Sequence, residues 1–512
     1  MSKIIKNDYT IEEYYNDIDT IGLEETWYFI IGLNYECSLP TNHPFHYSNF
    51  GVLYELGLAH INKQQKKESG VFYTPADVSE VLADMLSDIK ADNICDVACG
   101  TGNLIIKVLQ GMSKKDALGL LRGGHIYLYD NDALSLHIAK HTIGIIYGKD
   151  VVDSINCFIG NFLDSNCLLP DNAKVISNPP YYKINIGESK TPITEVVGQC
   201  RELYGAFMEK IIKGSVGSVI ITPYSFLNGS KFSKLRELLN NYSGKLISFD
   251  NVPGNIFNGG KIGTLSSSNR NSVRTTITVV DNIGDKGFQT TQLIRFHNSE
   301  RKEFLKKDFL YSLLSEKKQI VTKDTSYCKQ YKVLEDLWDE WVGGSVGTIK
   351  DLTVKDSEYK LYMPHSCRYY FCGVTYKMKR ATRDLICAKD EKSFYYLYAL
   401  LNSSFAYWYW RMFDGGICFS ASLALKMPCF INILSDDDFE KIKIIVDEMK
   451  VNETKCITEK LNAGEYQENI KFPINYRRIL DEILINILGS KVKNTDFDTI
   501  YSKTITSVSG VI

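Results

Sequence analysis

The tetrapeptide Asn178-Pro179-Pro180-Tyr181 is the segment of this 512-residue chain that points most directly to chemistry. The Asn178 side-chain oxygen and the Pro179 carbonyl can both accept from one NH2 group, and proline fixes that geometry. Two such acceptors would draw the nitrogen lone pair out of conjugation and aim it at an electrophile, while the Tyr181 ring stacks on a planar substrate. An amide acceptor makes a conventional general base unnecessary. The residues therefore predict activation of a planar amine.

A glycine turn earlier in the chain could hold a ligand. The segment that follows a β-rich run reads Asp96-Val97-Ala98-Cys99-Gly100-Thr101-Gly102-Asn103. Two glycines let the backbone approach a ligand closely, and the start of the following helix presents free N–H groups. Ile105 stands where the dinucleotide fingerprint requires glycine, which disfavours a pyrophosphate ligand. A purely structural turn is the alternative.

A carboxylate follows the next β-rich run, which ends in Tyr127-Leu128-Tyr129-Asp130. A carboxylate at this position can accept hydrogen bonds from both hydroxyls of a ribose. The other interpretation of Asp130 is an ordinary solvated acid in a loop.

Alternating strands and helices must position these groups. Apolar spacing predicts a helix over residues 76–89, and further helices over 104–110, 133–146 and 206–212. Short β-rich runs lie at 94–97, 125–129, 157–159, 174–177, 218–222, 246–250 and 275–280. This alternation favours an α/β fold with a doubly wound, mostly parallel sheet, whose ligands bind at the carboxyl ends of the strands.

In chain order, these motifs resemble the S-adenosylmethionine-dependent DNA adenine-N6 methyltransferases whose cofactor region precedes the recognition region. Gly70-Val71-Phe72-Tyr73-Thr74-Pro75 resembles the segment over the methionine end of the cofactor. Gly160-Asn161-Phe162-Leu163 resembles the adenine-binding segment, in which the family usually has an acid where Asn161 stands. Asn255-Ile256-Phe257-Asn258 is similar to a segment whose aromatic residue stacks on the flipped base, although a buried Phe257 is an equal alternative.

The resemblance implies a Rossmann-like class I methyltransferase fold and direct methyl transfer from S-adenosylmethionine to a flipped-out adenine. It assigns catalysis to Asn178, Pro179, Pro180 and Tyr181, base binding to Tyr181 and Phe257, and no metal. The residues it assigns to the cofactor are Tyr73, Thr74, Pro75, Asp96, Ala98, Gly100, Gly102, Asn103, Asp130, Asn161, Phe162, Asn178 and Pro180.

Several alternatives stay open at this point. A glutamine side chain of a protein and an RNA adenine present a similar amine, and cytosine-N4 transfer differs from adenine transfer only through the family resemblance. The chain could also be the modification subunit of a larger restriction complex, or a cofactor-binding protein without turnover. No nuclease domain is expected among these residues.

Residues beyond the catalytic region are expected to read the DNA sequence. We expect a helical extension at 1–60, a catalytic domain at 61–290 and a mixed α+β target-recognition domain at 291–512. The net charge of -2 offers no general attraction to a polyanion, so DNA must meet a local patch. A basic and aromatic stretch supplies candidate contacts at Arg368, Lys377, Lys379 and Arg380, with an ordinary solvated surface as the alternative. The aromatic segment 396–411 is interpreted as core.

Composition and resemblance together set the expected partners. Double-stranded DNA is the expected substrate, bound by a monomer, with a separate cognate restriction endonuclease as an optional partner. No stretch approaches the roughly 18 apolar residues of a membrane span, and no signal peptide is expected. Thirteen cysteines without a Cys-x-x-Cys pair favour reduced thiols and a cytoplasmic location.

Overall fold

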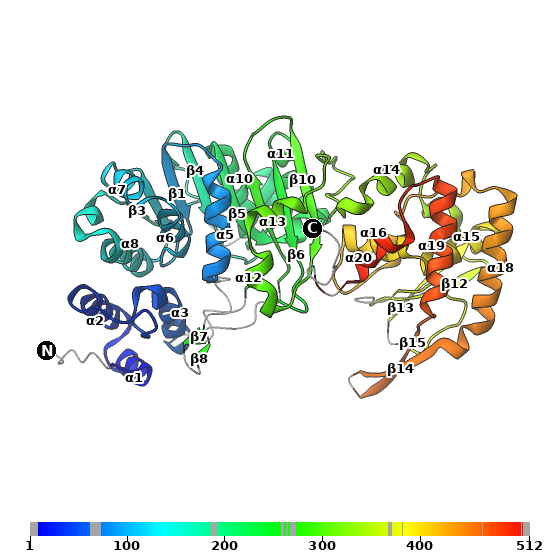
Figure 1. Ribbon diagram of the computed structural model, residues 1–512, viewed down its shortest axis with the longest axis horizontal. Helices are drawn as coiled ribbons and strands as arrows, with labels where there is room; N and C mark the ends of the chain where they lie inside the picture. Colours follow the sequence, from blue (N-terminus) through cyan, green and yellow to red (C-terminus); the bar gives the residue numbers. More distant parts are fainter. Residues whose placement is uncertain are drawn as a thin grey trace. The chain divides into compact units, whose positions relative to one another are not determined.

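The computed structural model describes residues 9–61, 73–185, 192–257, 261–262, 265–266, 273–366, 371–380, 382–462, 464–502 and 504. The chain forms two compact units: unit 1 is Met1–Thr290 with Phe296–Tyr327, and unit 2 is Thr291–Arg295 with Cys328–Ile512 (Figure 1). The expected boundary at residue 290 therefore needs correction, because most of the chain to residue 327 groups with unit 1. The expected boundary at residue 60 does not separate compact units.

The main sheet has eight strands in the order β10-β6-β9-β5-β4-β1-β2-β3, and all of it except the second half of β10 belongs to unit 1. The strands are β1 (Asn93–Val97), β2 (Ile126–Asp130), β3 (Asn156–Ile159), β4 (Ala173–Ser177), β5 (Gly217–Pro223), β6 (Ser243–Phe249), β9 (Thr275–Val280) and β10 (Gly287–Ile294). Strands β3, β2, β1, β4 and β5 pair in parallel, whereas β9 runs antiparallel to both β5 and β6. The predicted α/β, mostly parallel sheet is confirmed. A separate two-stranded pair joins β7 (Lys261–Ile262) to β8 (Leu265–Ser266).

Helices cover both faces of this sheet. Strand β4 is buried throughout, as expected for a strand with helices on each side. Cys95, Val97 and Val175 point into a core shared with Ile211 of one helix, and alternate strand residues face the opposite layer. The helices around the sheet are α5 (Ala76–Ser87), α6 (Asn103–Gln110), α7 (Lys114–Arg122), α8 (Ala133–Tyr147), α9 (Glu195–Cys200), α10 (Leu203–Gly214), α11 (Ser233–Leu239), α12 (Arg301–Phe304) and α13 (Lys307–Ser312).

Three amino-terminal helices pack onto unit 1: α1 (Ile11–Ile21), α2 (Leu23–Glu36) and α3 (Phe50–Ile61). Their aromatic core around Trp27 includes Ile138 of α8, which explains why they group with the sheet. Gly51 of α3 lies so close to the cofactor region that an added Cβ would meet Tyr73 at 2.3 Å and Asn103 at 2.7 Å. This glycine therefore permits helix α3 to support two of the predicted cofactor residues.

Unit 2 is a mixed α+β unit, as predicted. An antiparallel sheet of order β11-β13-β12 comprises β11 (Thr353–Val354), β12 (Lys360–Pro364) and β13 (Arg383–Ala388), and β14 (Ile457–Asn462) pairs with β15 (Glu465–Ile470) as a hairpin. The helices are α14 (Glu335–Gly343), α15 (Glu391–Asn402), α16 (Ser404–Phe413), α17 (Ala421–Ala424), α18 (Asp436–Asn452), α19 (Ile474–Leu488) and α20 (Asp498–Tyr501).

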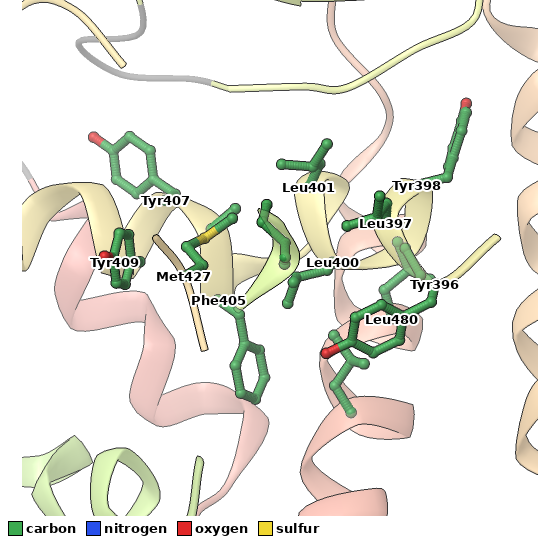
Figure 2. Close-up of a cluster of buried hydrophobic side chains, with 14 of the residues drawn as sticks. Tyr396, Leu397, Tyr398, Leu400, Leu401, Phe405, Tyr407, Tyr409, Met427 and Leu480 are labelled. Atoms are coloured by element: carbon green, nitrogen blue, oxygen red, sulfur yellow. The ribbon is translucent and has the colours of Figure 1, made fainter. Parts of the chain in front are cut away.

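The aromatic segment 396–411 forms the centre of the unit 2 core. Figure 2 shows side chains of α15 and α16, among them Tyr396, Leu400 and Phe405, gathered with Leu480 of α19. These side chains are buried, which confirms the interpretation of this segment as core rather than as a contact surface. Among the helices described, none has the length and apolar content needed to cross a membrane.

Candidate active site

The ends of three parallel strands bring the predicted motifs together. Strand β1 pairs in parallel with β2 and β4, and Val97 lies opposite both Tyr129 and Ser177. The glycine turn, Asp130 and Asn178 therefore leave the sheet at one edge, where doubly wound folds bind their ligands. The Ser177 hydroxyl donates to the Val97 carbonyl at 2.7 Å, which ties the end of β4 to β1.

The Asn178 amide is held at both ends. Its Nδ2 donates to Thr74 Oγ1 at 2.9 Å, and the Tyr181 hydroxyl donates to its Oδ1 at 2.7 Å. The same hydroxyl lies 2.9 Å from the Ile221 carbonyl oxygen of β5. Burial raises the pKa of Tyr181 well above its usual range, so the hydroxyl stays a neutral donor.

Two aromatic rings adjoin Tyr181. The ring of Tyr181 packs edge-on against Tyr204 and against Phe257, each at a centroid distance of 6.2 Å. Phe257 is buried with 5% exposure, and Tyr181 is half-buried. Phe257 therefore packs beside the Asn-Pro-Pro-Tyr motif, and its stacking on a base stays a prediction. Asn258, like Gly70 to Phe72, lies outside the described residues.

The glycine turn has the backbone shape expected of a ligand cradle. Ala98, Gly100 and Gly102 all have positive φ, at 57°, 51° and 81°. A Cβ at Gly102 would meet the Cβ of Ala139 at 2.9 Å, so glycine is needed there for packing. A Cβ at Gly100 would meet nothing within 4 Å, so that part of the turn faces open space. Asn103 follows as the first residue of helix α6.

Asp130 supports the turn from the adjacent strand. Its Oδ2 accepts from the Gly100 N–H at 2.8 Å, and its Oδ1 accepts from the Asp132 N–H at 2.9 Å. Burial raises the pKa of Asp130, while these N–H donors act in the opposite direction. The carboxylate is therefore fixed next to the glycine turn.

Asp96 lies beneath the turn rather than on its surface. The side chain is fully buried, and its Oδ2 accepts from the Ile105 N–H at 3.0 Å. Its Oδ1 is buried and has no hydrogen-bond partner within the described part of the chain. Burial, with a smaller contribution from the charge of Asp130, raises the pKa of Asp96 to about 8, while the Ile105 N–H acts in the opposite direction. A cationic group on a ligand would supply the missing partner.

The predicted adenine-binding segment follows β3. Asn161 Oδ1 accepts from the Leu163 N–H at 3.1 Å, and its Nδ2 donates to Asp164 at 3.0 Å. Phe162 is buried, with its ring 5.5 Å from the rings of both Tyr129 and Phe207. Asn161 therefore shapes its own turn, and Phe162 joins the core under it.

The basic residues of unit 2 that are predicted to contact DNA differ in how exposed their side chains are. Lys377 and Lys379 are exposed. Arg380 is half-buried, and its guanidinium donates to the side chain of Asn469, to the Glu468 carbonyl and to Ser366. Arg380 therefore joins the hairpin to β12's end, which argues against a direct phosphate contact. Arg368 lies outside the described residues.

Two buried acids that sequence reasoning missed hold the loop carrying these lysines. Glu453 accepts from the backbone N–H groups of Thr375 and Tyr376, both at 2.8 Å. Glu468 accepts from the Lys379 N–H at 2.6 Å. Neither acid lies near a basic motif in sequence, so no local signal marks them. These two acids therefore fix the backbone of residues 375–379, while the side chains of Lys377 and Lys379 stay exposed.

The part of the sequence that forms this site matches the model of a known protein family. The model of the family described as N-6 DNA Methylase matches residues 46–305, about half of the chain. The chain belongs to the N-6 DNA Methylase family. The match covers the sheet of unit 1, the glycine turn and the Asn-Pro-Pro-Tyr motif, so the recognition from sequence is confirmed.

Individual relatives of this N-6 DNA Methylase chain are distant. It is 26% identical over 159 residues to the type I restriction enzyme MjaIX methylase subunit of Methanocaldococcus jannaschii. This match covers 28% of this chain and 27% of that protein. It is 29% identical over 167 residues to the type II methyltransferase M.VspI of Vibrio sp. (strain 343). This match covers 32% of this chain and 35% of that protein. The matches thus span about a quarter to a third of these relatives.

Two solved structures align with this chain at low TM-scores. The type ISP restriction-modification enzyme LlaBIII bound to DNA aligns over 70% of this chain and 30% of its own, with 12% identity and a TM-score of 0.41. The M protein of the type I restriction enzyme EcoKI aligns over 69% of this chain and 73% of its own, with 14% identity and a TM-score of 0.35.

Proposed function

We propose that this protein is a site-specific DNA adenine-N6 methyltransferase that uses S-adenosylmethionine. The observation that carries the proposal is the Asn178 amide, which is oriented by Thr74 and Tyr181 at the carboxyl end of β4. Family membership supports DNA as the substrate class. The choice of adenine over cytosine rests on the Asn-Pro-Pro-Tyr motif as it occurs in the related adenine enzymes.

The residues around the glycine turn fit S-adenosylmethionine. Gly100 leaves open space where a ligand can approach, and Asp130 offers a carboxylate beside it for ribose hydroxyls. The buried, unpartnered Oδ1 of Asp96 suits a ligand that carries an ammonium group, as the methionine end of this cofactor does. Tyr73, Thr74 and Pro75 would cover that end. When bound, the cofactor supplies a methyl group activated by its sulfonium charge.

The chain's own residues then need to orient the amine. Asn178 Oδ1 and the Pro179 carbonyl accept from the exocyclic NH2, which localises the nitrogen lone pair towards the methyl group. Pro180 keeps the two acceptors in a fixed relation, and Tyr181 contributes both its bond to Asn178 and a ring beside the base. The base leaves the DNA stack to reach this edge, at a cost of a few kcal/mol.

Lys377 and Lys379 are proposed to contact DNA phosphates from a loop that Glu453 and Glu468 hold rigid. Affinity for DNA falls as salt rises, and each lysine-to-alanine change should reduce the magnitude of the slope of log affinity against log salt by about 1. The double change should reduce it by about 2, because fewer counterions are released. Titration of a short random-sequence duplex at several salt concentrations measures the slope.

Lys491 provides the matched control for these lysines. It is an exposed lysine of unit 2 that follows helix α19, outside the proposed contact loop. Lys491→Ala should leave the salt slope unchanged. An unchanged slope in the Lys377→Ala/Lys379→Ala double variant would contradict the assignment of the loop to DNA.

A second arrangement is supported by two relatives that are named methylase subunits of type I restriction enzymes. In that arrangement a separate chain would read the DNA sequence. Our proposal is instead a monomer that binds double-stranded DNA through unit 2. We place it in the cytoplasm, with a separate endonuclease as an optional partner. Size-exclusion chromatography with a DNA duplex separates the two. A one-to-one complex of this chain with DNA supports the monomer.

The destination of the methyl group tests the function itself. Purified protein is incubated with labelled S-adenosylmethionine and either unmethylated genomic DNA, RNA or a protein extract. The proposal predicts label in DNA, recovered as N6-methyladenine after digestion to nucleosides. Label recovered as N4-methylcytosine, or in RNA or protein glutamine instead, would contradict it.

A further inference from the structure

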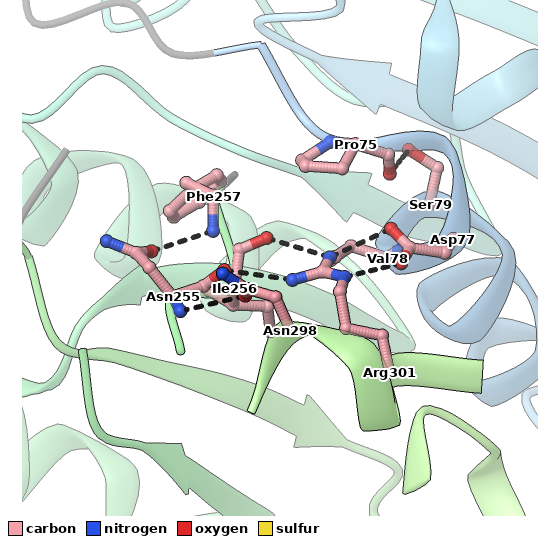
Figure 3. Close-up of polar contacts among 9 residues, drawn as sticks. All are labelled: Pro75, Asp77, Val78, Ser79, Asn255, Ile256, Phe257, Asn298 and Arg301. Atoms are coloured by element: carbon pink, nitrogen blue, oxygen red, sulfur yellow. Dashed lines mark hydrogen bonds and ion pairs between the residues drawn. The ribbon is translucent and has the colours of Figure 1, made fainter. Parts of the chain in front are cut away.

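Arg301 of helix α12 connects two segments that border the catalytic motif. Its Nε donates to Asp77 Oδ2 at 2.7 Å and its Nη2 to Asp77 Oδ1 at 2.9 Å, which makes a two-pronged ion pair. Its Nη1 donates to the Asn255 carbonyl at 2.9 Å, and Nη2 also donates to the Ile256 carbonyl at 3.0 Å. Figure 3 shows the guanidinium between the acid of α5 and these two carbonyls.

The acid at one side of this contact belongs to the cofactor side of the site. Asp77 lies in the first turn of α5, three residues after Thr74, whose hydroxyl accepts from the Asn178 amide. Asp77 Oδ1 also accepts from the Val78 N–H at 2.9 Å, so the carboxylate is part of the helix start. A shift of Asp77 would therefore move the start of α5 and, with it, the residue that holds Asn178.

The carbonyls at the other side belong to the segment that ends in Phe257. The Phe257 N–H donates to Asn255 Oδ1 at 2.8 Å, and the Phe257 ring lies edge-on to Tyr181. The Gly254 N–H donates to the Phe296 carbonyl at 2.7 Å, which attaches this segment to the stretch that leads into α12. Arg301 then joins both to α5.

Only an arginine suits this arrangement. The side chain of Arg301 is 11% exposed, and four of its N–H groups point in fixed directions to two carboxylate oxygens and two carbonyls. A lysine ammonium keeps the positive charge but lacks the planar fork, so it cannot satisfy all four acceptors at once. Because the Asp77 side chain is 42% exposed, solvent screens the charge attraction, and the directed bonds to Asp77 and to the two backbone carbonyls define the clamp.

We propose that Arg301 is a positioning residue that keeps the Asn255–Phe257 segment in register with Thr74, and thereby aligns the target amine with the methyl donor. The inference rests on the proposed function. Displacement of reacting groups by about 1 Å can cost about 100-fold in rate, so a lost clamp should act mainly on the chemical step. A residue of merely structural importance would lower stability without changing turnover of the folded enzyme.

The test compares Arg301→Lys with the wild type on unmethylated genomic DNA. We expect kcat to fall by about 10- to 100-fold, with a smaller rise in the Kd for S-adenosylmethionine, measured by calorimetry, because Thr74 moves with the start of α5. Asp77→Asn removes the same ion pair from the other side and should lower kcat in the same way. The double variant should lower kcat little more than either single variant, because both changes break the same clamp. Arg122→Lys, at an exposed pair with Asp150, is the matched control and should be neutral.

Hydrogen exchange at the Phe257 amide provides a readout that needs no activity. Exchange there should become faster in Arg301→Lys, whereas amides of helix α6 should not change. If the wild type is active and Arg301→Lys has the same kcat, the inference about Arg301 is overturned and the proposed function stands. If the wild type methylates no DNA, the proposed function fails, and unchanged exchange at Phe257 would overturn the clamp independently.

Discussion

Asn178→Ala should lower the rate of methyl transfer by about 10³-fold, which corresponds to about 4 kcal/mol of lost transition-state stabilisation. The change removes the acceptor that Tyr181 contacts, and with it the group proposed to localise the lone pair of the target amine. The Kd for S-adenosylmethionine should stay within a few fold, because the glycine turn and Asp130 are untouched. Single-turnover rates and calorimetry measure the two quantities.

Two further variants at and near this position make the result specific. Asn178→Asp keeps an oxygen acceptor and should retain more activity than Asn178→Ala. Asn166→Ala changes an exposed asparagine of the same unit and should have no effect. Turnover of Asn178→Ala close to that of the wild type would contradict the role of the amide.

Asp130→Ala should weaken the affinity for S-adenosylmethionine by about 10- to 100-fold, or about 1.4 to 2.7 kcal/mol. The carboxylate accepts from the Gly100 N–H and is proposed to accept from the ribose hydroxyls, so the change removes a ligand contact and a support of the turn together. Asp130→Asn keeps one acceptor for Gly100 and should fall between the wild type and Asp130→Ala. Calorimetric titration gives the values.

Asp132 separates the binding effect from a general loss of stability. Its side chain caps helix α8 by accepting from the Leu134 N–H at 3.0 Å. Asp132→Ala should cost about 1 kcal/mol of unfolding free energy and leave cofactor affinity unchanged. Equal cofactor affinity in Asp130→Ala and the wild type would count against the ribose assignment.

Runs rich in β-branched residues predict the central strands of the fold well, because such residues favour the strand conformation. The prediction at 174–177 differs from β4 by one residue, and residues 275–280 coincide with β9. Strand direction is not encoded in such a run, so the antiparallel course of β9 had to come from the structure. In strand β10, Gln289 and Gln292 flank two threonines and break up the run, which hides the strand from the same reasoning.

The candidate site could be predicted in part for a geometric reason. Parallel strands end at one edge, so motifs that directly follow strands are expected to meet there. The hydrogen bond between Thr74 and Asn178 joins residues 104 apart, and the clamp of Arg301 on Asp77 joins residues 224 apart. Such pairs depend on how side chains pack after folding, which no local motif encodes.

Charge alone also failed to separate residues of different function in unit 2. Lys379 and Arg380 are neighbours in sequence, yet the first is exposed and the second is engaged with Ser366 and the β15 hairpin. The difference follows from the path of the loop, whose backbone N–H groups are bound by Glu453 and Glu468. Burial and hydrogen bonding therefore had to identify the available cations.

Sequencing of modified bases in a living host tests the central claim most directly. The chain is expressed in a host that lacks adenine methylation, with Asn178→Ala as the inactive control, and the genomic DNA is read by a single-molecule method that detects modified bases. The account predicts N6-methyladenine at one short sequence motif, only with the unaltered chain. A genome without modified adenine, from cells whose purified protein binds S-adenosylmethionine, would contradict the claim that this chain alone recognises and methylates DNA.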